Sequence, residues 1–341
     1  MSFFSTTRNA VNLGLQGGGA HGAFTWGVLD YLLEDGRLVF EGISGTSAGA
    51  MNAVVLAQGL MTGGREGARQ ALTNFWNAVA DSVPFAQSIG SDGGQSPKLG
   101  PALKLMLHLT DYFSPSQLNP LDLNPLRKII DTQVDFEQLR KHSPVKLFVA
   151  TTHANSGKLR MFQSSELSVD VVLASACLPS IHHTIMIDGE PYWDGGYSAN
   201  PAVFPLFYYC DSHDILLVLL TPLKYKETPF SAQEIKRRQQ ELGFQSTFLR
   251  EMRMFAHLRE FVKGSWFQLG KFERRIARSN FHVIAADDLM SELPAETKAI
   301  ANKQFFTMLF DSGREHAKSW IDQNHGVIGK RSNVELANLF Y

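Results

Sequence analysis

Apolar runs and helix-like patterns alternate through the first sixty residues. Residues 11–15 are apolar and lead into three glycines, and the apolar positions between Phe24 and Leu33 then recur at the spacing of one helix face. A β-branched and aromatic run at 38–43 breaks at a second glycine-containing turn, and residues 50–60 follow as a helix of small residues. Strand, glycine turn and helix, twice in succession, predict a parallel sheet.

The rest of the chain predicts further strands and helices and one long polar loop. Residues 65–81 have a helical pattern, and 86–100 are rich in glycine and serine, which predicts a loop or flap. Downstream we expect strands at 146–152, 159–162, 185–187, 192–193, 215–220 and 281–285, and helices at 169–176, 231–280 and 296–323. These elements are most consistent with one catalytic domain that has a helical C-terminal portion.

The composition narrows the class of protein. Of 341 residues, 44% are hydrophobic, 11% aromatic and 19% charged, which excludes a mostly disordered chain. A net charge of −1 argues against a nucleic-acid partner, and two cysteines exclude a disulfide-dense secreted scaffold. We find neither an apolar run of the roughly 20 residues that span a bilayer nor a secretory signal pattern. We therefore expect a cytoplasmic protein, either free or peripheral at a membrane.

The second glycine turn has the form of a nucleophile elbow, Gly45-Thr46-Ser47-Ala48-Gly49. A serine hydroxyl is a weak nucleophile, and a sharp turn between strand and helix exposes it only if small residues flank it. The helix that follows presents its N-terminus to developing negative charge. The predicted strand before this turn and helix after it favour Ser47 as a nucleophile.

The first glycine turn, residues 17–22 with the sequence GGGAHG, allows two interpretations. It fits a dinucleotide-binding loop, with Glu41 near the spacing of a ribose-binding acid. It also fits an oxyanion hole, in which backbone N–H groups stabilise a tetrahedral intermediate. The elbow serine that follows roughly 25 residues later favours the oxyanion hole, because a dinucleotide fold has no use for it.

A third motif, Asp194-Gly195-Gly196, follows a short predicted strand. A carboxylate at a strand end can accept the proton of a nearby serine. By itself, this motif is more typical of an ordinary Asp-Gly turn.

Taken together, the three motifs resemble the patatin-like phospholipase family, which has a glycine-rich oxyanion loop, a G-x-S-x-G elbow and a downstream D-G-[GA] motif. Residues 174–179 (ASACLP) also resemble a segment of that family. The resemblance covers roughly residues 10–220. It implies an α/β fold of patatin type, a mixed, mostly parallel sheet flanked by helices in an αβα sandwich. Residues 8–225 would form the catalytic domain and 226–341 a mainly helical extension packed on it.

The resemblance also implies a Ser-Asp dyad hydrolase that needs no metal or other cofactor. Ser47 would be the nucleophile and Asp194 the base. The oxyanion hole would be formed by the backbone N–H groups of Gly17, Gly18, Gly19 and Ala48. The supporting motif residues are His21, Gly22, Gly45, Gly49, Gly195 and Gly196.

One position departs from the family pattern, since His21 stands where the glycine loop usually has Lys or Arg. If His21 acts electrostatically, its effect should weaken as the pH rises through its pKa. The alternative is that it simply begins the following helix.

A conventional Ser-Asp-His hydrolase is the main alternative for the chemistry. Histidines follow Asp194 at His213, His257, His282, His316 and His325. However, that fold builds several strands before its nucleophile, and only one is predicted before the glycine loop. We expect His282, inside a predicted strand, to be a core residue. The adjacent pair His182-His183 does not predict a metal site, because neighbours in a strand face opposite ways.

The segment 231–280 is strongly basic, with eleven Lys and Arg against five Asp and Glu. It could contact anionic lipid, with Trp266, Phe267 and Phe272 as apolar wedges and Arg274, Arg275 and Arg278 as the polar face. Solvated helix faces or a self-association surface are the alternatives. An apolar stripe at Phe248, Met252, Phe255 and Leu258 has core spacing and makes a homodimer one expectation.

We therefore expect a serine acyl-ester hydrolase of lipids, of phospholipase A or lysophospholipase type. The alternatives are an esterase or thioesterase that acts on neutral lipid or storage polyester, and a lipid-binding module without turnover. Fold-level resemblance does not fix the substrate.

Overall fold

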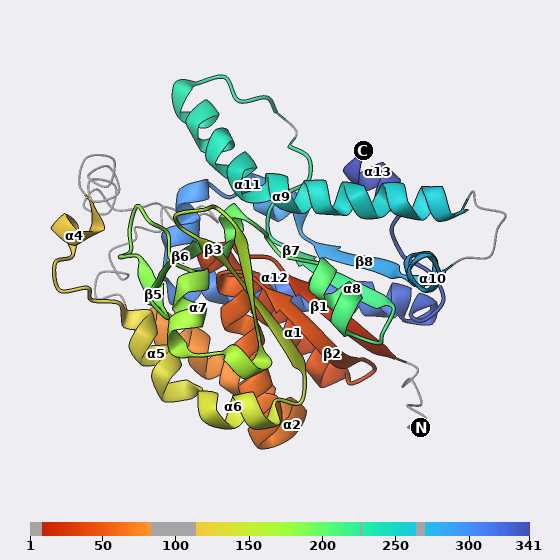
Figure 1. Cartoon of the computed structure of the whole chain (residues 1–341), viewed down its shortest axis with the longest axis horizontal. Helices are drawn as coiled ribbons and strands as arrows, with labels where there is room; N and C mark the ends of the chain where they lie inside the picture. Colours follow the sequence, from red (N-terminus) through yellow and green to blue (C-terminus); the bar gives the residue numbers. More distant parts are fainter. Residues whose placement is uncertain (1–8, 83–113, 226, 264–269) are drawn as a thin grey trace.

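The computed structural model describes residues 9–82, 114–225, 227–263 and 270–341 (Figure 1). Eight strands within these ranges form one sheet in the order β5-β6-β3-β2-β1-β7-β8, with β4 paired to β3. The strands in parallel pairs are β1 (Ala10–Leu15), β2 (Val39–Gly45), β3 (Lys146–His153), β7 (Asp214–Leu219) and β8 (Asn280–Ala285). Those that pair antiparallel to their neighbours are β4 (Leu159–Gln163), β5 (Ile185–Ile187) and β6 (Glu190–Asp194).

The helices connect these strands and cover both faces of the sheet. They are α1 (Gly22–Asp35), α2 (Ala48–Asp81), α4 (Pro115–Leu118), α5 (Pro125–Gln133), α6 (Phe136–His142), α7 (Val169–Ser175), α8 (Phe204–Tyr209), α9 (Ala232–Lys263), α10 (Lys271–Arg278), α11 (Asp287–Glu292), α12 (Lys303–Asn324) and α13 (Leu336–Phe340). Short 3-10 turns are η1 (Gly19–His21), η3 (Ser164–Glu166), η4 (Gly195–Tyr197), η5 (Ala295–Ala299) and η6 (His325–Val327). Figure 1 shows α9 on one face of the sheet and α1 and α2 on the other.

Strand β7, second from one edge of the sheet, has one hydrophobic core on each of its faces. Successive side chains of a strand point to opposite faces. Leu216 and Val218 accordingly lie in the core under α1, α2 and α12. Ile215, Leu217 and Leu219 lie in the core under α8, α9 and α13. This two-sided burial confirms the expected sandwich of a mixed, mostly parallel sheet flanked by helices.

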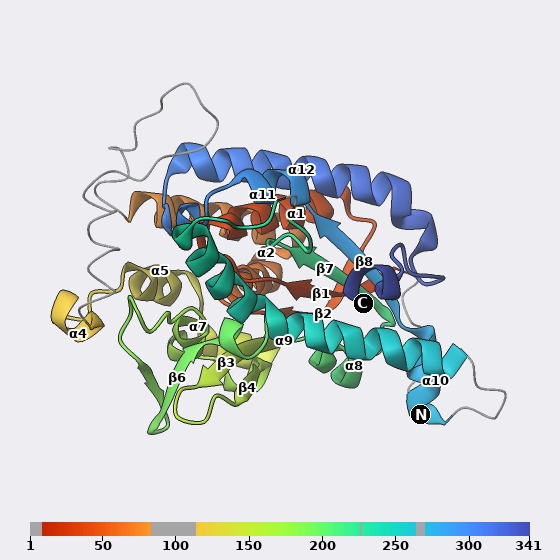
Figure 2. The same ribbon diagram turned by 90° about the horizontal axis from the view of Figure 1, so that it is seen from above.

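The helix α12, from the C-terminal part of the chain, packs along α1 (Figure 2). The two helices approach so closely that a Cβ on Gly27 would lie 2.0 Å from the carbonyl oxygen of Phe310. Only glycine fits such a backbone contact. Residues after 226 therefore pack on the element that follows the first glycine turn.

Some predicted boundaries differ from the structure. The predicted helices at 50–60 and 65–81 are present as the two parts of α2, which begins at Ala48 and is interrupted by non-helical backbone at Gly63 and Gly64. The predicted helix at 296–323 begins only at Lys303, where the Asn302 side chain accepts the N–H of Phe305 as an N-cap, and residues 295–299 form the turn η5 instead. The predicted loop at 86–100 lies outside the described residues.

The basic segment 231–280 supplies α9 and α10. Its apolar stripe is used by the chain itself: Phe248 and Met252 are fully buried in the second core, and Phe255 is 8% exposed there. The stripe therefore offers no open face for a homodimer, which stays a prediction without that support.

The residues predicted to contact lipid are only partly described. Phe272 is 43% exposed, whereas the guanidinium group of Arg275 donates to the carbonyl oxygens of Phe207 and Cys210. Trp266 and Phe267 lie outside the described residues. Membrane contact through this segment stays a prediction. Within the described ranges, no helix combines the length and apolarity needed to cross a bilayer.

Candidate active site

Ser47 occupies a strained turn between β2 and α2. Its backbone has φ 54° and ψ −123°, a conformation that non-glycine residues rarely adopt. The turn is held by its neighbours, since the Thr46 N–H donates to Leu15 O at 3.3 Å and the Gly49 N–H donates to Thr46 O at 2.8 Å. Ser47 is therefore placed as the elbow motif predicts, at the carboxyl end of a parallel strand and the first turn of a helix.

The first glycine turn lies directly against this elbow. A Cβ built on Gly17 would lie 2.9 Å from Ser47 Cβ and 2.7 Å from Thr46 O, so only glycine allows the approach. Gly19 has φ 56°, which also favours glycine. Other glycines of the three motifs lie in the turns or at the ends of the adjoining elements, at Gly22, Gly45, Gly49, Gly195 and Gly196.

Asp194 ends β6 and is 3% exposed. It is paired with Thr151 in the sheet, and the Thr152 hydroxyl donates to its carbonyl oxygen at 2.8 Å. Its Oδ1 accepts the N–H of Gly196 at 2.7 Å. The second glycine of the motif thus fixes the direction of the Asp194 side chain.

The structure brings Asp194 and Ser47 together, since the Ser47 side chain is close enough to the Asp194 carboxylate to lower the pKa of that group through hydrogen bonding. Burial raises the pKa of Asp194 from 3.8 to about 7, although hydrogen bonds from Gly196 and Ser47 act in the opposite direction. A carboxylate with a pKa near neutrality is suited to accept and return a proton.

Backbone N–H groups around Ser47 form the candidate oxyanion hole. The N–H of Gly17 is not available, because it donates to Asn200 Oδ1 at 2.7 Å. The prediction that Gly17 donates to the oxyanion is therefore wrong. Within the described part of the chain, the N–H groups of Gly18, Gly19 and Ala48 have no hydrogen-bond acceptor. These three are the donors that remain for an oxyanion.

Asn200 is a site residue that the sequence did not reveal. It is 5% exposed; its Oδ1 holds Gly17, and its carbonyl oxygen accepts the side-chain amide of Gln16 at 3.2 Å. The preceding residue, Ala199, accepts the Thr46 hydroxyl at 2.8 Å. The segment after the Asp194 motif therefore contacts both the glycine turn and the elbow, and no local pattern marks it.

Ser175, at the end of α7, supports the elbow from another side. Its hydroxyl oxygen accepts the N–H of Ser47 at 2.9 Å, and the residue is fully buried. Ser175 belongs to the segment 174–179, which resembles the family but to which the sequence assigned no function. The contact with Ser47 gives it one.

His21 is buried at 2% exposure and does not carry the charge that one interpretation required. Burial, and to a lesser degree the charges of Lys298 and Arg237, lower its pKa from 6.5 to about 3. The imidazole is therefore neutral at physiological pH, and the interpretation that gives His21 a positive charge beside the oxyanion hole is wrong. Its Nε2 lies 2.7 Å from the hydroxyl of Thr297. His21 precedes α1 as its N-cap residue, as the other interpretation expected.

Several of the other histidines have structural partners. His282 is fully buried in β8 and lies 2.8 Å from Asp214 Oδ1, which confirms it as a core residue. None of the five histidines that follow Asp194 is hydrogen-bonded to Asp194 or Ser47 in the described chain. His182 accepts the Leu178 N–H at 3.3 Å, and His183 Nε2 lies 2.8 Å from Asn119 O.

Helix α9 borders the site on the side of Asp194. The ring of Tyr197, next to the Asp194 motif, packs against the ring of Phe244 with centroids 4.6 Å apart. Tyr197 is 40% exposed. An aromatic surface from two parts of the chain therefore lies beside the buried carboxylate.

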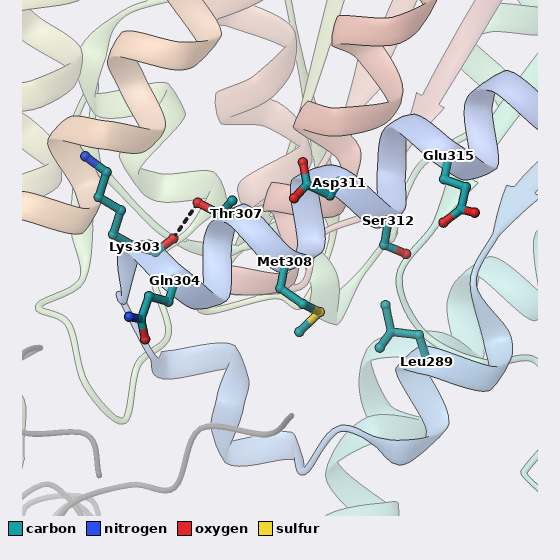
Figure 3. Close-up of a pocket in the computed structure, with 8 residues that line it drawn as sticks. All are labelled: Leu289, Lys303, Gln304, Thr307, Met308, Asp311, Ser312 and Glu315. Atoms are coloured by element: carbon teal, nitrogen blue, oxygen red, sulfur yellow. Dashed lines mark hydrogen bonds between the residues drawn. The ribbon is translucent and has the colours of Figure 1, made fainter. Parts of the chain in front are cut away.

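A groove of about 930 Å³ lies elsewhere, along the outward face of α12 (Figure 3). It is lined by Leu289 of α11 and by α12 residues that include Lys303, Met308 and Asp311. None of the predicted site residues lines it. The groove is thus separate from the candidate active site.

Comparison with known proteins agrees with the motifs. The family model described as patatin-like phospholipase matches residues 13–207. Among solved structures, the crystal structure of VipD from Legionella pneumophila is similar at 16% identity, with a TM-score of 0.39, and the match covers 97% of this chain and 72% of that one. No curated protein matches the sequence.

Proposed function

Since this chain belongs to the patatin-like phospholipase family of lipid acyl hydrolases, we propose that Ser47 and Asp194 form a catalytic dyad that cleaves acyl esters of phospholipids or lysophospholipids. The proximity of the Ser47 side chain to the buried Asp194 carboxylate carries this proposal. The family match includes both residues.

In the first half-reaction, Asp194 takes the proton of the Ser47 hydroxyl as Oγ attacks the ester carbonyl carbon. The carbonyl oxygen becomes an oxyanion, and the N–H groups of Gly18, Gly19 and Ala48 are the donors available to it. The intermediate then expels the alcohol, which leaves with the proton held on Asp194. An acyl group remains on Ser47.

In the second half-reaction, Asp194 removes a proton from water, which attacks the acyl-enzyme carbonyl. Collapse of this second intermediate releases the fatty acid and returns the proton to Ser47 Oγ. One carboxylate serves as base and then as acid in each half-reaction. A pKa of about 7 makes both directions accessible near neutral pH.

The surroundings of the dyad support a lipid ester as substrate. Tyr197 and Phe244 place apolar rings beside Asp194, and burial of the carboxylate indicates a site with little water. An acyl chain matches such a surface, whereas a small polar ester would gain little from it.

The test is a lipidomic comparison. Wild-type protein and Ser47→Ala are incubated with a total membrane lipid extract, and the species that fall and appear are identified by mass spectrometry. We expect fatty acids and lysophospholipids to accumulate only with wild type, and the depleted headgroups to name the substrate.

Ser44→Ala is the matched control. Ser44 is a fully buried serine three residues before the nucleophile, and its hydroxyl has no partner within the described chain. It should keep wild-type turnover. Turnover in Ser47→Ala would overturn the dyad. Depletion of neutral lipids alone would keep the dyad and replace the phospholipid substrate.

A further inference from the structure

The turn η5, from the C-terminal part of the chain, packs on the first glycine turn. The carbonyl oxygen of Lys298 lies so close to Gly19 that a Cβ there would be 2.3 Å away. The Thr297 hydroxyl lies 2.7 Å from His21 Nε2, with Thr297 only 1% exposed. Two successive residues of η5 thus touch the loop that carries the Gly18 and Gly19 N–H groups.

The Thr297 hydroxyl has one proton, and it donates that proton to Pro294 O at 2.5 Å. Its oxygen therefore accepts a hydrogen bond from His21, which must carry its proton on Nε2. A pKa of about 3 keeps the imidazole neutral, so this single proton stays in place across the working pH range. His21 is then held in one tautomer and one orientation.

The imidazole is also packed from the same side of the chain. The ring of Phe305, at the start of α12, meets it edge-on with centroids 6.1 Å apart. His21 follows directly on Gly19 and Ala20 within η1, and its N–H donates to Gly18 O at 3.2 Å. Fixing the His21 side chain therefore fixes the two peptide groups before it.

The opposite end of the loop has its own anchor, because the Gly17 N–H donates to Asn200. The Gly18 and Gly19 peptides lie between the two anchors. An oxyanion hole works because its donors are already oriented before charge develops. A loop held at one end only would leave that orientation to thermal motion.

We propose that Thr297 is a positioning residue that orients the oxyanion loop through its hydrogen bond with His21. This inference rests on the proposed hydrolase function, since the loop's role in catalysis comes from there. It assigns part of the catalytic geometry to residues about ninety positions beyond the end of the matched family region.

The experiment compares Thr297→Val, which has nearly the same shape but no hydroxyl, with Thr297→Ser, which keeps the hydroxyl. Turnover of a p-nitrophenyl acyl ester is measured in the full chain. We expect kcat to fall about tenfold in Thr297→Val with KM within about twofold, and Thr297→Ser to restore most of kcat. The size of the fall is below the 10²–10³ seen on removal of a whole donor, because the donors remain.

A second readout separates positioning from a general loss of folded protein. An alkyl trifluoromethyl ketone accepts Ser47 Oγ at its carbonyl carbon and places an oxyanion in the hole. Its Ki should rise in Thr297→Val by about the same factor as kcat/KM falls. Partial unfolding would lower the active fraction and leave Ki unchanged, and that result would overturn the inference.

Ser279→Ala is the control for loss of a buried hydroxyl in the same part of the chain, because Ser279 is 3% exposed and its hydroxyl donates to Arg275 O. It should lose stability and keep kcat. If Thr297→Val does not fold, His21→Gln, which retains a side-chain N–H donor, is compared with His21→Leu, which has none. Equal kcat in the two members of either pair overturns the positioning role. If the wild type still hydrolyses the ester, the proposed hydrolase function is unaffected by that result. A wild type that hydrolyses no ester removes both.

Discussion

Asn200 Oδ1 accepts the N–H of Gly17 at 2.7 Å, across 183 residues of sequence. The contact joins the segment after the catalytic carboxylate to the start of the oxyanion loop. Gln16 strengthens the junction, since its side-chain amide donates to Asn200 O and its Oε1 accepts the N–H groups of Leu220 and Thr221. The proposed base and the proposed oxyanion hole are therefore parts of one hydrogen-bonded unit.

This relationship predicts that Asn200→Ala lowers kcat about tenfold, because Gly17 loses its acceptor and the loop loses one anchor. Asn200→Asp should be worse, about a hundredfold, because a carboxylate would stand beside a developing oxyanion. Steady-state kinetics with a soluble ester measure both. Asn12→Ala is the matched control, because Asn12 is a buried amide in β1, the strand that leads to the glycine turn, and its Nδ2 donates to Ser212 O. Wild-type kcat in Asn200→Asp would contradict the prediction.

A second prediction concerns Ser175. Removing its hydroxyl in Ser175→Ala leaves the Ser47 N–H without its acceptor in a strained turn, which should cost about 1–3 kcal/mol of stability. We expect kcat to fall at least fivefold, because the nucleophile is aimed by that turn. Thermal unfolding and ester turnover are measured together.

Ser168→Ala tests whether that effect is local. Ser168 caps the other end of the same helix α7, where its hydroxyl accepts the N–H of Val171 at 3.3 Å. Loss of an N-cap costs about 1 kcal/mol, so both variants should lose stability. Only Ser175→Ala should lose kcat. Equal loss of kcat in both would show that α7 acts as a whole and that Ser175 has no special role.

The sequence was sufficient for the local features of the site and insufficient for its long-range contacts. Ser47 and the glycine turn were proposed because strand, turn and helix follow each other within a few residues. Asp194 was proposed because the three motifs together resemble one family. Asn200 and Thr297 act through hydrogen bonds to residues far away in sequence. No periodicity or local spacing encodes such a bond, so only the folded chain reveals it.

The two interpretations of the glycine loop that the structure contradicts, for Gly17 and for His21, failed for the same reason. The Gly17 N–H was assigned to the oxyanion because its neighbours were, yet Asn200 already uses it. The alternative of an electrostatic effect required a protonated His21 ring, whereas α12 and η5 bury the ring and burial lowers its pKa to about 3. In both cases, the loop was predicted correctly, and what packs on it from elsewhere was not predictable.

A third prediction follows from the pKa of Asp194, which burial raises to about 7. The dyad needs the carboxylate form, so kcat/KM for a neutral ester should rise with pH, bend near pH 7 and stay level above it. His21, with a pKa of about 3, adds no further change in this range. A rise that bends near pH 4, or a fall between pH 7 and 9, would contradict the assignment of Asp194 as the base with a raised pKa.

The same carboxylate predicts a gain of stability when its charge is removed. The folded state holds the Asp194 proton with a pKa of about 7, against 3.8 for the ordinary group. The stability that comes from binding this proton is present below pH 3.8 and is lost as the pH rises through about 7. Asp194→Asn, which is neutral at every pH, should therefore raise the free energy of unfolding by up to about 4 kcal/mol at pH 8 and have little effect at pH 4. Denaturant unfolding at both pH values measures the difference.

Asp188→Asn, which removes a carboxylate at an exposed turn, is the control for this measurement. An Asp194→Asn protein that is less stable at pH 8 would mean that the folded state stabilises the charged carboxylate, and this would contradict the raised pKa of Asp194.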